Sequence, residues 1–440
     1  IKCLLCYSPY LCKIQANNTA ENENAIAAYS RLSDGTIKFI NFYKTNGTGI
    51  NNDTNGKLGP QDNDTQIVVT ADHKHMYSVN VHSNTISGFD IHKDGSLTPI
   101  AGSPFASHGI APVSLTISGD ILMAANRNED YHQTETLSDA AGASYTSLKI
   151  QNDGSLVYAD KFKVSGFHKP TQIRASSTVK NLFFGNDFQV DADFDGEGDR
   201  SFLVGPKTSV QGQLHSFKVD SAGHITEADR QLLPETINDY LYIGSPGVPT
   251  MPLGIWDHPT KNILYAGFVT RNQLGVYTYD EAGKLTFKVA VENGGQDICW
   301  VLPNKEGTRL YAVNNLPRLG SEQKGSTISV YDISGEKALK PEQIQIVSIP
   351  SLADVFVNNR NLKQPGSTSF EITLSPDEKY VYLINQRIDQ TKRNTNKQGN
   401  IINSFSVDGN GMLKHVASKN LLEDGFPFNA RPQGAVALDL

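Results

Sequence analysis

Polar and charged side chains recur where short apolar runs of this sequence begin or end, which is where β proteins place their site residues. One of them, His168, stands just before an apolar run, and imidazole is suited to acid–base chemistry near neutral pH. The others carry amide, guanidinium or carboxylate groups: Asn126, Arg127, Asp187, Arg271, Asn315, Arg387 and Arg431. Arginine binds carboxylate or phosphate through two parallel hydrogen bonds. The set predicts a site for a small anionic or polyoxygenated ligand, with His168 as general base and the other residues binding substrate.

A structural explanation competes for the asparagines. An asparagine that follows a strand often hydrogen-bonds its own turn through its side chain. Asn126 and Asn315 are each the kind of residue that recurs after an apolar run, so turn formation explains them without a ligand.

A second stretch with chemical content is acidic. Five carboxylates alternate along it, at Asp191, Asp193, Asp195, Glu197 and Asp199. This spacing, with Gly196 at the sixth place, resembles the start of a calcium-binding EF-hand loop. The twelfth place is Phe202, so the closing glutamate of such a loop is missing. The stretch therefore predicts either bound Ca²⁺ or a solvated acidic loop, and no other cofactor is expected.

Composition excludes several classes of partner. The 440 residues carry a net charge of -7, and no run of Lys and Arg exceeds two residues. Nucleic acid and anionic membranes are therefore not expected partners. No apolar run approaches the roughly 18 residues that would span a bilayer. The 37 glycines and 20 prolines are typical of a loop-rich β protein.

The N-terminal part indicates export. Four Asn-x-Ser/Thr sequons occur early, at Asn17, Asn46, Asn52 and Asn63, in polar stretches expected to be exposed. Three of the four cysteines, Cys3, Cys6 and Cys12, crowd the first dozen residues. A disulfide among them, the remnant of a signal peptide, and a redox or metal role for the Cys-x-x-Cys pair all stay open. We expect a secreted or extracellular protein, periplasmic if bacterial.

The elements that must position these residues come from a repeat. One copy is ISGFDIHKDGSLTPI (86–100), an apolar strand, a glycine-containing turn and a second short strand. Seven copies occur, and we assign their turn glycines as Gly35, Gly95, Gly154, Gly223, Gly283, Gly335 and Gly409. Glycine is expected there because tight hairpins need a backbone position with positive φ. A hairpin of this size is marginal alone and needs neighbours.

A second repeated pattern precedes six of the copies. It is an apolar strand, a polar turn and a very apolar strand, as in PVSLTISGDILMAAN (112–126). Four strands per repeat and seven repeats predict an all-β, seven-bladed propeller of four-stranded blades. We expect the C-terminal strand 432–438 to join the first blade and residues 4–15 to supply its next strand, which closes the ring. A six-bladed ring with a stray hairpin is the alternative. Residues 1–24 form a Cys-rich N-terminal segment, and 25–440 form one propeller domain.

The same segments resemble a known family. ISGFDIHKDGSLTPIAGSPF (86–105), CWVLPNKEGTRLYAVNN (299–315) and SFEITLSPDEKYVYLIN (369–385) are similar to lactonase-type seven-bladed propellers, which include bacterial 6-phosphogluconolactonases and fungal carboxymuconate lactonising enzymes. The resemblance covers roughly residues 25–440. It implies a catalytic His, matched by His168, an Arg before a later strand, and a Glu in an Asn-Glu pair. Here no Arg leads into Cys299, and the pair is Asn314-Asn315, so two of the three positions differ.

Two functions follow from these residues. The first is a lactone hydrolase or cyclase acting at the mouth of the central channel. The second is an extracellular propeller that binds a small ligand or a protein without chemistry. The family resemblance favours the first, and the sequons, long loops and two unmatched positions favour the second.

Overall fold

The computed structural model describes residues 9–15, 23–49, 65–128, 142–164, 168–188, 212–234, 250–269, 271–316, 322–323, 325–351, 356–357, 363–364, 366–387, 399–427 and 430–440. Nearly all regular structure in these ranges is β-strand, as the alternating apolar pattern predicts. Two short 3-10 helices are the exceptions, η2 (Gly335–Leu339) and η3 (Leu421–Asp424).

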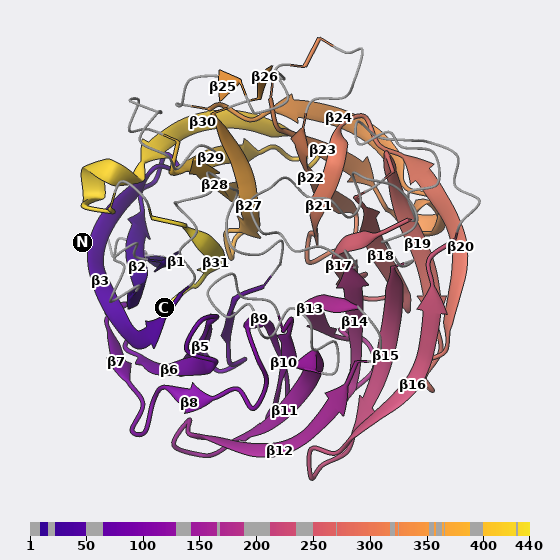
Figure 1. The fold of residues 1–440 in the computed structure, drawn as a ribbon. Helices are drawn as coiled ribbons and strands as arrows, with labels where there is room; N and C mark the ends of the chain where they lie inside the picture. The colour runs from indigo at the N-terminus through magenta and orange to yellow at the C-terminus, as the bar shows by residue number, and fades with distance from the viewer. Residues whose placement is uncertain are drawn as a thin grey trace, which may run out of the picture.

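The strands form antiparallel sheets that stand side by side around a central axis (Figure 1). Six sheets have four strands each. Written from the centre outward, the first three are β31 (Gln433–Ala437), β1 (Pro9–Gln15), β2 (Glu23–Arg31), β3 (Ile37–Thr48); β9 (Pro112–Ser118), β10 (Ile121–Asn126), β11 (Ser144–Ile150), β12 (Leu156–Lys163); and β13 (Lys169–Ala175), β14 (Leu182–Phe188), β15 (Gln213–Val219), β16 (Ile225–Leu232).

The other three four-stranded sheets follow the same order. They are β17 (Pro252–Asp257), β18 (Ile263–Phe268), β19 (Gln273–Tyr279), β20 (Leu285–Glu292); β21 (Gln296–Pro303), β22 (Arg309–Leu316), β23 (Thr327–Asp332), β24 (Glu342–Ser348); and β27 (Ser367–Leu374), β28 (Tyr380–Arg387), β29 (Ile401–Val407), β30 (Leu413–Asn420). A separate two-stranded ribbon pairs β25 (Phe356–Val357) with β26 (Lys363–Gln364).

The predicted count of seven four-stranded blades was wrong, because six sheets have four strands. The remaining sheet has five: β4 (Ile67–Val69), β5 (His75–Asn80), β6 (Thr85–Ile91), β7 (Leu97–Pro99) and β8 (Phe105–Ala106). β7 ends at Pro99, which has no N–H for the ladder. The chain then loops away and returns as β8 to pair with the start of β6. The outer edge of this sheet is therefore two short strands.

The prediction that the two ends of the chain meet in one sheet is confirmed. β31 pairs antiparallel with β1, and β1 pairs with β2. The closure joins the last strand of the chain to the first sheet, so neither end leaves an open sheet edge at the seam.

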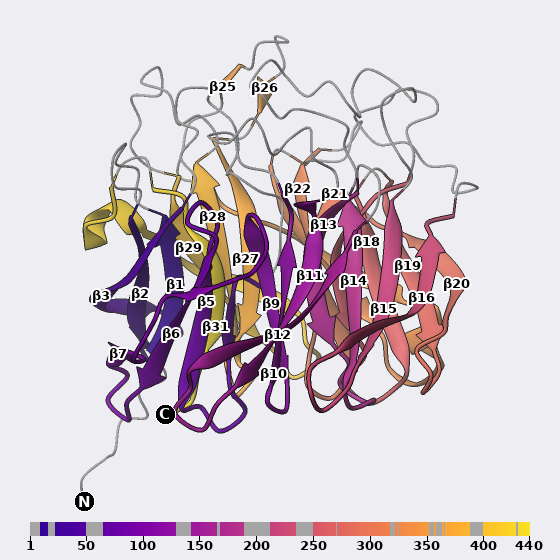
Figure 2. The same cartoon turned by 60° about the horizontal axis from the view of Figure 1, so that its bottom comes forward.

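The two faces of the ring differ in which strand ends they carry (Figure 2). We call the face where the innermost strands begin the entry face, and the face where they end the turn face. Antiparallel pairing returns the second strand of each sheet to the entry face, as in β9 and β10. Residues after a second strand and before a first strand therefore meet at the entry face.

Neighbouring sheets are joined by a repeated hydroxyl contact. A Tyr or Ser hydroxyl donates to a backbone carbonyl in the outer turn of the next sheet, and these carbonyls include several turn glycines. The pairs are Tyr77 to Gly154, Ser147 to Gly223, Ser216 to Gly283, Tyr265 to Ala338, Tyr311 to Gly411 and Tyr382 to Gly35. The last contact ties the final four-stranded sheet to the first. The repeated hairpin turn is thus part of the packing between sheets.

One turn glycine was assigned to the wrong residue. In the turn between β29 and β30 the positive φ, +78°, is at Gly411. Gly409 is not among the residues with positive φ that the structure describes. Gly411 takes the left-handed conformation that closes the turn, since its N–H donates to the Asp408 carbonyl.

Candidate functional site

The predicted substrate-binding residues reach the entry face, but they are spread around it. Asn126 ends β10, Asp187 and Asn315 lie near the ends of β14 and β22, and Arg387 ends β28. Arg127 and Arg271 follow second strands, and Arg431 precedes β31. All seven are buried, with exposed fractions of 4% or less. Burial of four arginines at one face is unusual for a solvated rim.

The asparagines serve as contacts between strands and between sheets. Asn80 donates to Ser87 Oγ (2.7 Å) on the next strand and accepts from Thr45 Oγ1 (2.9 Å) of the neighbouring sheet. Asn314 likewise donates to Ser329 Oγ (3.0 Å) and accepts from Asn293 Nδ2 (2.6 Å). Asn126 donates to Thr146 Oγ1 (3.0 Å).

These bonds give the recurring asparagines a structural role that differs from the expected turn cap. Asn315 belongs to the same pattern in part, because its Nδ2 lies 3.3 Å from Cys299 Sγ. Its backbone carbonyl accepts from Ser326 Oγ (2.9 Å).

Asp187 lies at the centre of a buried hydrogen-bonded cluster. Its Oδ2 is 2.7 Å from His215 Nε2 and 2.6 Å from Gln213 Nε2, and its Oδ1 accepts from the Tyr145 hydroxyl at 2.7 Å. The other imidazole nitrogen, His215 Nδ1, lies 2.7 Å from Glu227 Oε1. We call these five residues the His215 cluster.

The charges of the His215 cluster stabilise one another. Burial alone would lower the pKa of His215, but the Asp187 and Glu227 carboxylates outweigh it and raise that pKa to about 9. Burial alone would raise the pKa of Asp187, but His215 and the hydrogen bonds hold it below its ordinary value. The pair is therefore imidazolium and carboxylate at neutral pH.

His168 stands near this cluster without joining it. Its side chain is half-buried, and its Nδ1 has no hydrogen-bond partner among the described residues. Burial lowers its pKa, partly opposed by the Asp187 charge and reinforced by His215 and Arg230. His168 is therefore a neutral imidazole at pH 7, the form that accepts a proton. None of the ion pairs found in the described ranges involves it.

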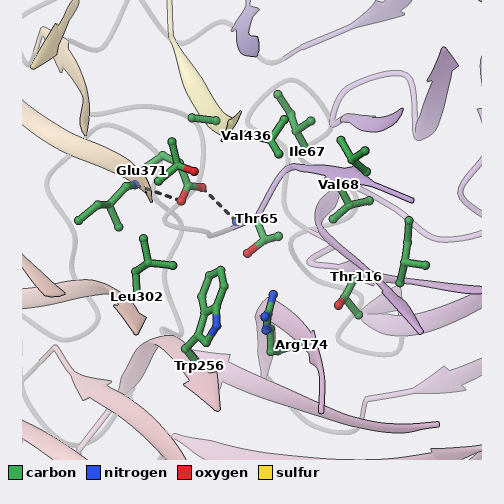
Figure 3. Close-up of a pocket in the computed structure, with 14 residues that line it drawn as sticks. Thr65, Ile67, Val68, Thr116, Arg174, Trp256, Leu302, Glu371 and Val436 are labelled. Carbon is green, nitrogen blue, oxygen red and sulfur yellow. Dashed lines mark hydrogen bonds between the residues drawn. The ribbon is translucent and has the colours of Figure 1, made fainter. Parts of the chain in front are cut away.

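A cavity of about 240 Å³ lies in the central channel (Figure 3). It is lined mainly by residues of the innermost strands, and none of the predicted site residues lines it. Five of the lining residues occupy the same position in their repeats. This position is two residues before the residue whose N–H closes the turn between the first and second strands of the sheet. The five residues are Val68, Arg174, Trp256, Leu302 and Thr373.

A cation is held at one side of this cavity. The Arg174 guanidinium carbon lies 3.7 Å from the centroid of the Trp256 ring, a cation–π contact. Its Nε lies 3.6 Å from Asp257 Oδ1, and Asp257 is fully buried. Burial raises the pKa of Asp257, partly opposed by Arg174 and by hydrogen bonds from Ser177.

A carboxylate is held at the other side of the cavity (Figure 3). Glu371 is 3% exposed, and it accepts from the backbone N–H of Ile372 at 3.1 Å and of Thr65 at 3.2 Å. Thr65 in turn accepts at Oγ1 from Gln172 (3.2 Å) and at its carbonyl from the Leu115 N–H (2.9 Å). Thr65 is thus tied to three innermost strands, β9, β13 and β27.

The sequence analysis missed His215, Arg174, Trp256 and Glu371. A usable signal was present for Arg174 and Trp256. Each is a charged or aromatic residue near the end of an innermost strand, at a position where other repeats carry Val68, Leu302 and Thr373. His215 alternates with Gln213 and Phe217 along β15, so one face of that strand carries an amide, an imidazole and a phenyl ring.

Several predictions fall on other parts of the chain. The acidic stretch 191–199 and the sequons at Asn17, Asn52 and Asn63 lie outside the described residues. Asn46 is exposed near the end of β3. Within the described ranges there is no group of three or more His, Cys, Asp or Glu placed to hold a metal. The described segments also include no helix with the length and hydropathy to cross a membrane.

Comparison with known proteins identifies similar folds among solved structures. No family model matches this sequence, and no curated protein matches it. Solved structures do match over almost the whole chain. One is the periplasmic gluconolactonase PpgL of Pseudomonas aeruginosa, with a TM-score of 0.62, 13% identity and coverage of 98% of this chain and 99% of that one.

Two further structures show that proteins with different names share this fold. A candidate 6-phosphogluconolactonase from Bacteroides fragilis matches with a TM-score of 0.60, 15% identity and 100% coverage of both chains. A hypothetical selenium-binding protein from Sulfolobus tokodaii matches with a TM-score of 0.61, 10% identity and coverage of 98% and 93%. The likeness supports the predicted lactonase-like propeller as a fold. Since one fold hosts several functions, function must be argued from the site.

Proposed function

We propose that this protein is a lactonase-type propeller that opens a small lactone at the entry face, with His168 as the general base. The observation that carries the proposal is the state of the His168 imidazole. It is half-buried, its pKa is lowered by burial, and its Nδ1 has no hydrogen-bond partner in the part of the chain that is described. A neutral imidazole near a channel mouth can accept a proton from water.

The chemistry is a hydrolysis. His168 takes a proton from water while the water oxygen bonds to the lactone carbonyl carbon. The ring C–O bond of the lactone then breaks, and its oxygen takes the proton back from His168 as an alcohol. The product is a hydroxy acid, which loses its acidic proton to solvent at neutral pH.

Two observations support this proposal. The chain shares its fold with a protein named as a gluconolactonase. Four arginines, Arg127, Arg271, Arg387 and Arg431, are buried at the entry face, where their charge favours a lactone that carries an anionic group.

The test is a pH-stat assay with D-glucono-1,5-lactone and the corresponding 6-phospho lactone, corrected for spontaneous hydrolysis. We expect His168→Gln to lose at least a hundredfold in kcat/KM, within the range for a lost general base. The matched control is His224→Gln, because His224 is an exposed histidine that pairs with Asp220. Equal rates in His168→Gln and wild type, above the spontaneous rate, would refute the role of His168.

A second function is favoured by one specific observation. Asp187, the acidic residue near His168, is already bound by Tyr145, Gln213 and His215. No ion pair found in the described ranges orients His168, so a propeller that binds a ligand or an extracellular protein without hydrolysis fits the same site. Wild-type hydrolysis at the spontaneous rate, together with lactone binding that Arg174→Gln leaves unchanged, would establish this function instead.

We also propose that the protein is exported and glycosylated, with Asn46 as one acceptor. Its support is the Asn46-Gly47-Thr48 sequon and the exposure of Asn46 in β3. Expression in a secreting eukaryotic host should yield a species that peptide-N-glycosidase shifts to lower mass, and Asn46→Gln should remove one glycan. An unchanged glycan count in Asn46→Gln would exclude this site.

Calcium binding by the acidic stretch 191–199 remains a proposal. Its support is the alternation of carboxylates with small or apolar residues. Bound Ca²⁺ would raise Tm, and EGTA would reverse the rise. Equal Tm with Ca²⁺ and with EGTA would leave the solvated acidic loop as the explanation.

A further inference from the structure

We propose that the channel cavity is a second binding site, specific for a small hydroxylated carboxylate. It is separate from the entry-face site around His168, because none of the residues that line it belongs to that site. The proposal does not depend on lactone hydrolysis.

The size of the cavity sets the size of the ligand. Its volume of about 240 Å³ is on the order of eight water molecules at about 30 Å³ each. Cavities for drug-sized ligands begin at about 300 Å³. A single small metabolite is therefore enough to fill it.

Arg174 supplies the contact for the carboxylate. The Trp256 ring and the buried Asp257 fix the plane of its guanidinium group before any ligand arrives. A fixed guanidinium loses little side-chain entropy when it binds a carboxylate through two hydrogen bonds. The side chain is 22% exposed, and it is among the groups that line the cavity.

Glu371 supplies the contact for hydroxyl groups. Two backbone N–H groups hold its carboxylate in place, and a carboxylate offers about four lone-pair sites to donors. Figure 3 shows Glu371 and Arg174 on opposite sides of the cavity, with Thr65 between them. A ligand that spans the cavity therefore meets a cation at one end and an acceptor at the other.

The rest of the lining selects a hydroxylated chain over an amine. Thr116 Oγ1 accepts from the Ala175 N–H (2.9 Å), so its own O–H is left to donate. One ligand hydroxyl can accept that bond and another can donate to Glu371, whereas an ammonium group only donates. A second carboxylate would be repelled by Glu371. The apolar part of the lining, including Ile67, Leu302 and Val436, suits the C–H surface of the chain.

The experiment is isothermal titration calorimetry with D-gluconate, and with sorbitol and D-glucarate as comparison probes. We expect gluconate to bind at least tenfold more tightly than either. Sorbitol lacks the carboxylate, and glucarate carries a second one. His168→Gln should leave gluconate binding unchanged, which separates this site from the entry face.

Two variants test the cavity itself. Arg174→Gln should weaken gluconate binding at least tenfold, and Val68→Phe should do the same by placing a ring in the cavity without touching either charge (Figure 3). Arg309→Gln is the matched control, an arginine paired with Asp332 and absent from the lining.

Three results would overturn the proposal. The first is unchanged binding in a folded Val68→Phe variant, and the second is sorbitol binding equal to that of gluconate. The third is gluconate binding that is lost in His168→Gln and kept in Arg174→Gln. The absence of any binding at millimolar gluconate would also overturn it.

Discussion

Replacing His215 by glutamine removes the only cation of the His215 cluster while keeping a polar side chain. Asp187 and Glu227 would then face each other without the imidazolium between them. Removing one partner of a buried ion pair costs about 3 to 5 kcal/mol, because the other charge is left in a medium that solvates it poorly. His215 is 1% exposed and Asp187 is fully buried, so this range applies without a discount for solvent screening.

The change in melting temperature follows from the size of the chain. The entropy of unfolding is about 2.1 cal/mol/K per residue, so 440 residues give about 0.9 kcal/mol/K. A loss of about 3 to 5 kcal/mol should therefore lower Tm by about 3 to 5 °C. Differential scanning calorimetry at pH 6 measures it. His224→Gln is the matched control, because the His224–Asp220 pair has the same chemistry at 3.0 Å but is mostly exposed. We expect it to change Tm by less than about 1 °C.

The same cluster predicts a pH dependence with a definite sign. The folded pKa of His215, about 9, lies above its ordinary value of 6.5. The stabilisation is therefore complete below about pH 6.5, and it is lost as the pH rises toward 9. At about 1.4 kcal/mol per pH unit, the wild type should lose about 3 kcal/mol over this range. The His215→Gln protein should lack this decline. An equal decline in both proteins, or a Tm for His215→Gln within about 1 °C of wild type, would refute the reasoning.

The remaining predictions concern the scaffold and the base. Tyr382→Phe removes the hydroxyl bond to Gly35 between the last and first sheets, and should cost about 1 kcal/mol in chemical denaturation; an unchanged midpoint would contradict a role in closure. Gly295→Ala should cost about 1 to 3 kcal/mol, because an added Cβ would lie 2.2 Å from the buried Asn314 side chain. Gly409→Ala, where nothing lies within 4 Å, should be neutral, and equal effects of both would rule out the clash. If His168 is the base, kcat/KM should rise with pH below 6.5 and be level at pH 7, because burial lowers the pKa of His168. A pH profile in which kcat/KM reaches half of its maximum above pH 7 would assign the proton transfer to another base.

Most of the scaffold could be predicted from local pattern. The hairpin at 86–100 appears as β6 and β7, and the strand at 432–438 closes the first sheet as β31. Strand alternation and turn chemistry act over a few residues, so a single sequence carries them. The count of four-stranded blades was wrong because the split of one outer strand into β7 and β8 depends on pairing with β6. That pairing is a tertiary contact.

The sequence by itself determined the fold class, the closure of the ring and the entry face as the place where polar side chains gather, because repeats of strand and turn encode all three. Only the tertiary structure decided which side chains meet. Arg174, Trp256 and Glu371 come from three different sheets and converge because their strands are all innermost in the ring. His215 pairs with Asp187 because β15 lies beside β14 in a register that brings the two together. Such contacts between residues distant in the chain depend on register and on the order of sheets, and neither is a property of a local stretch of sequence.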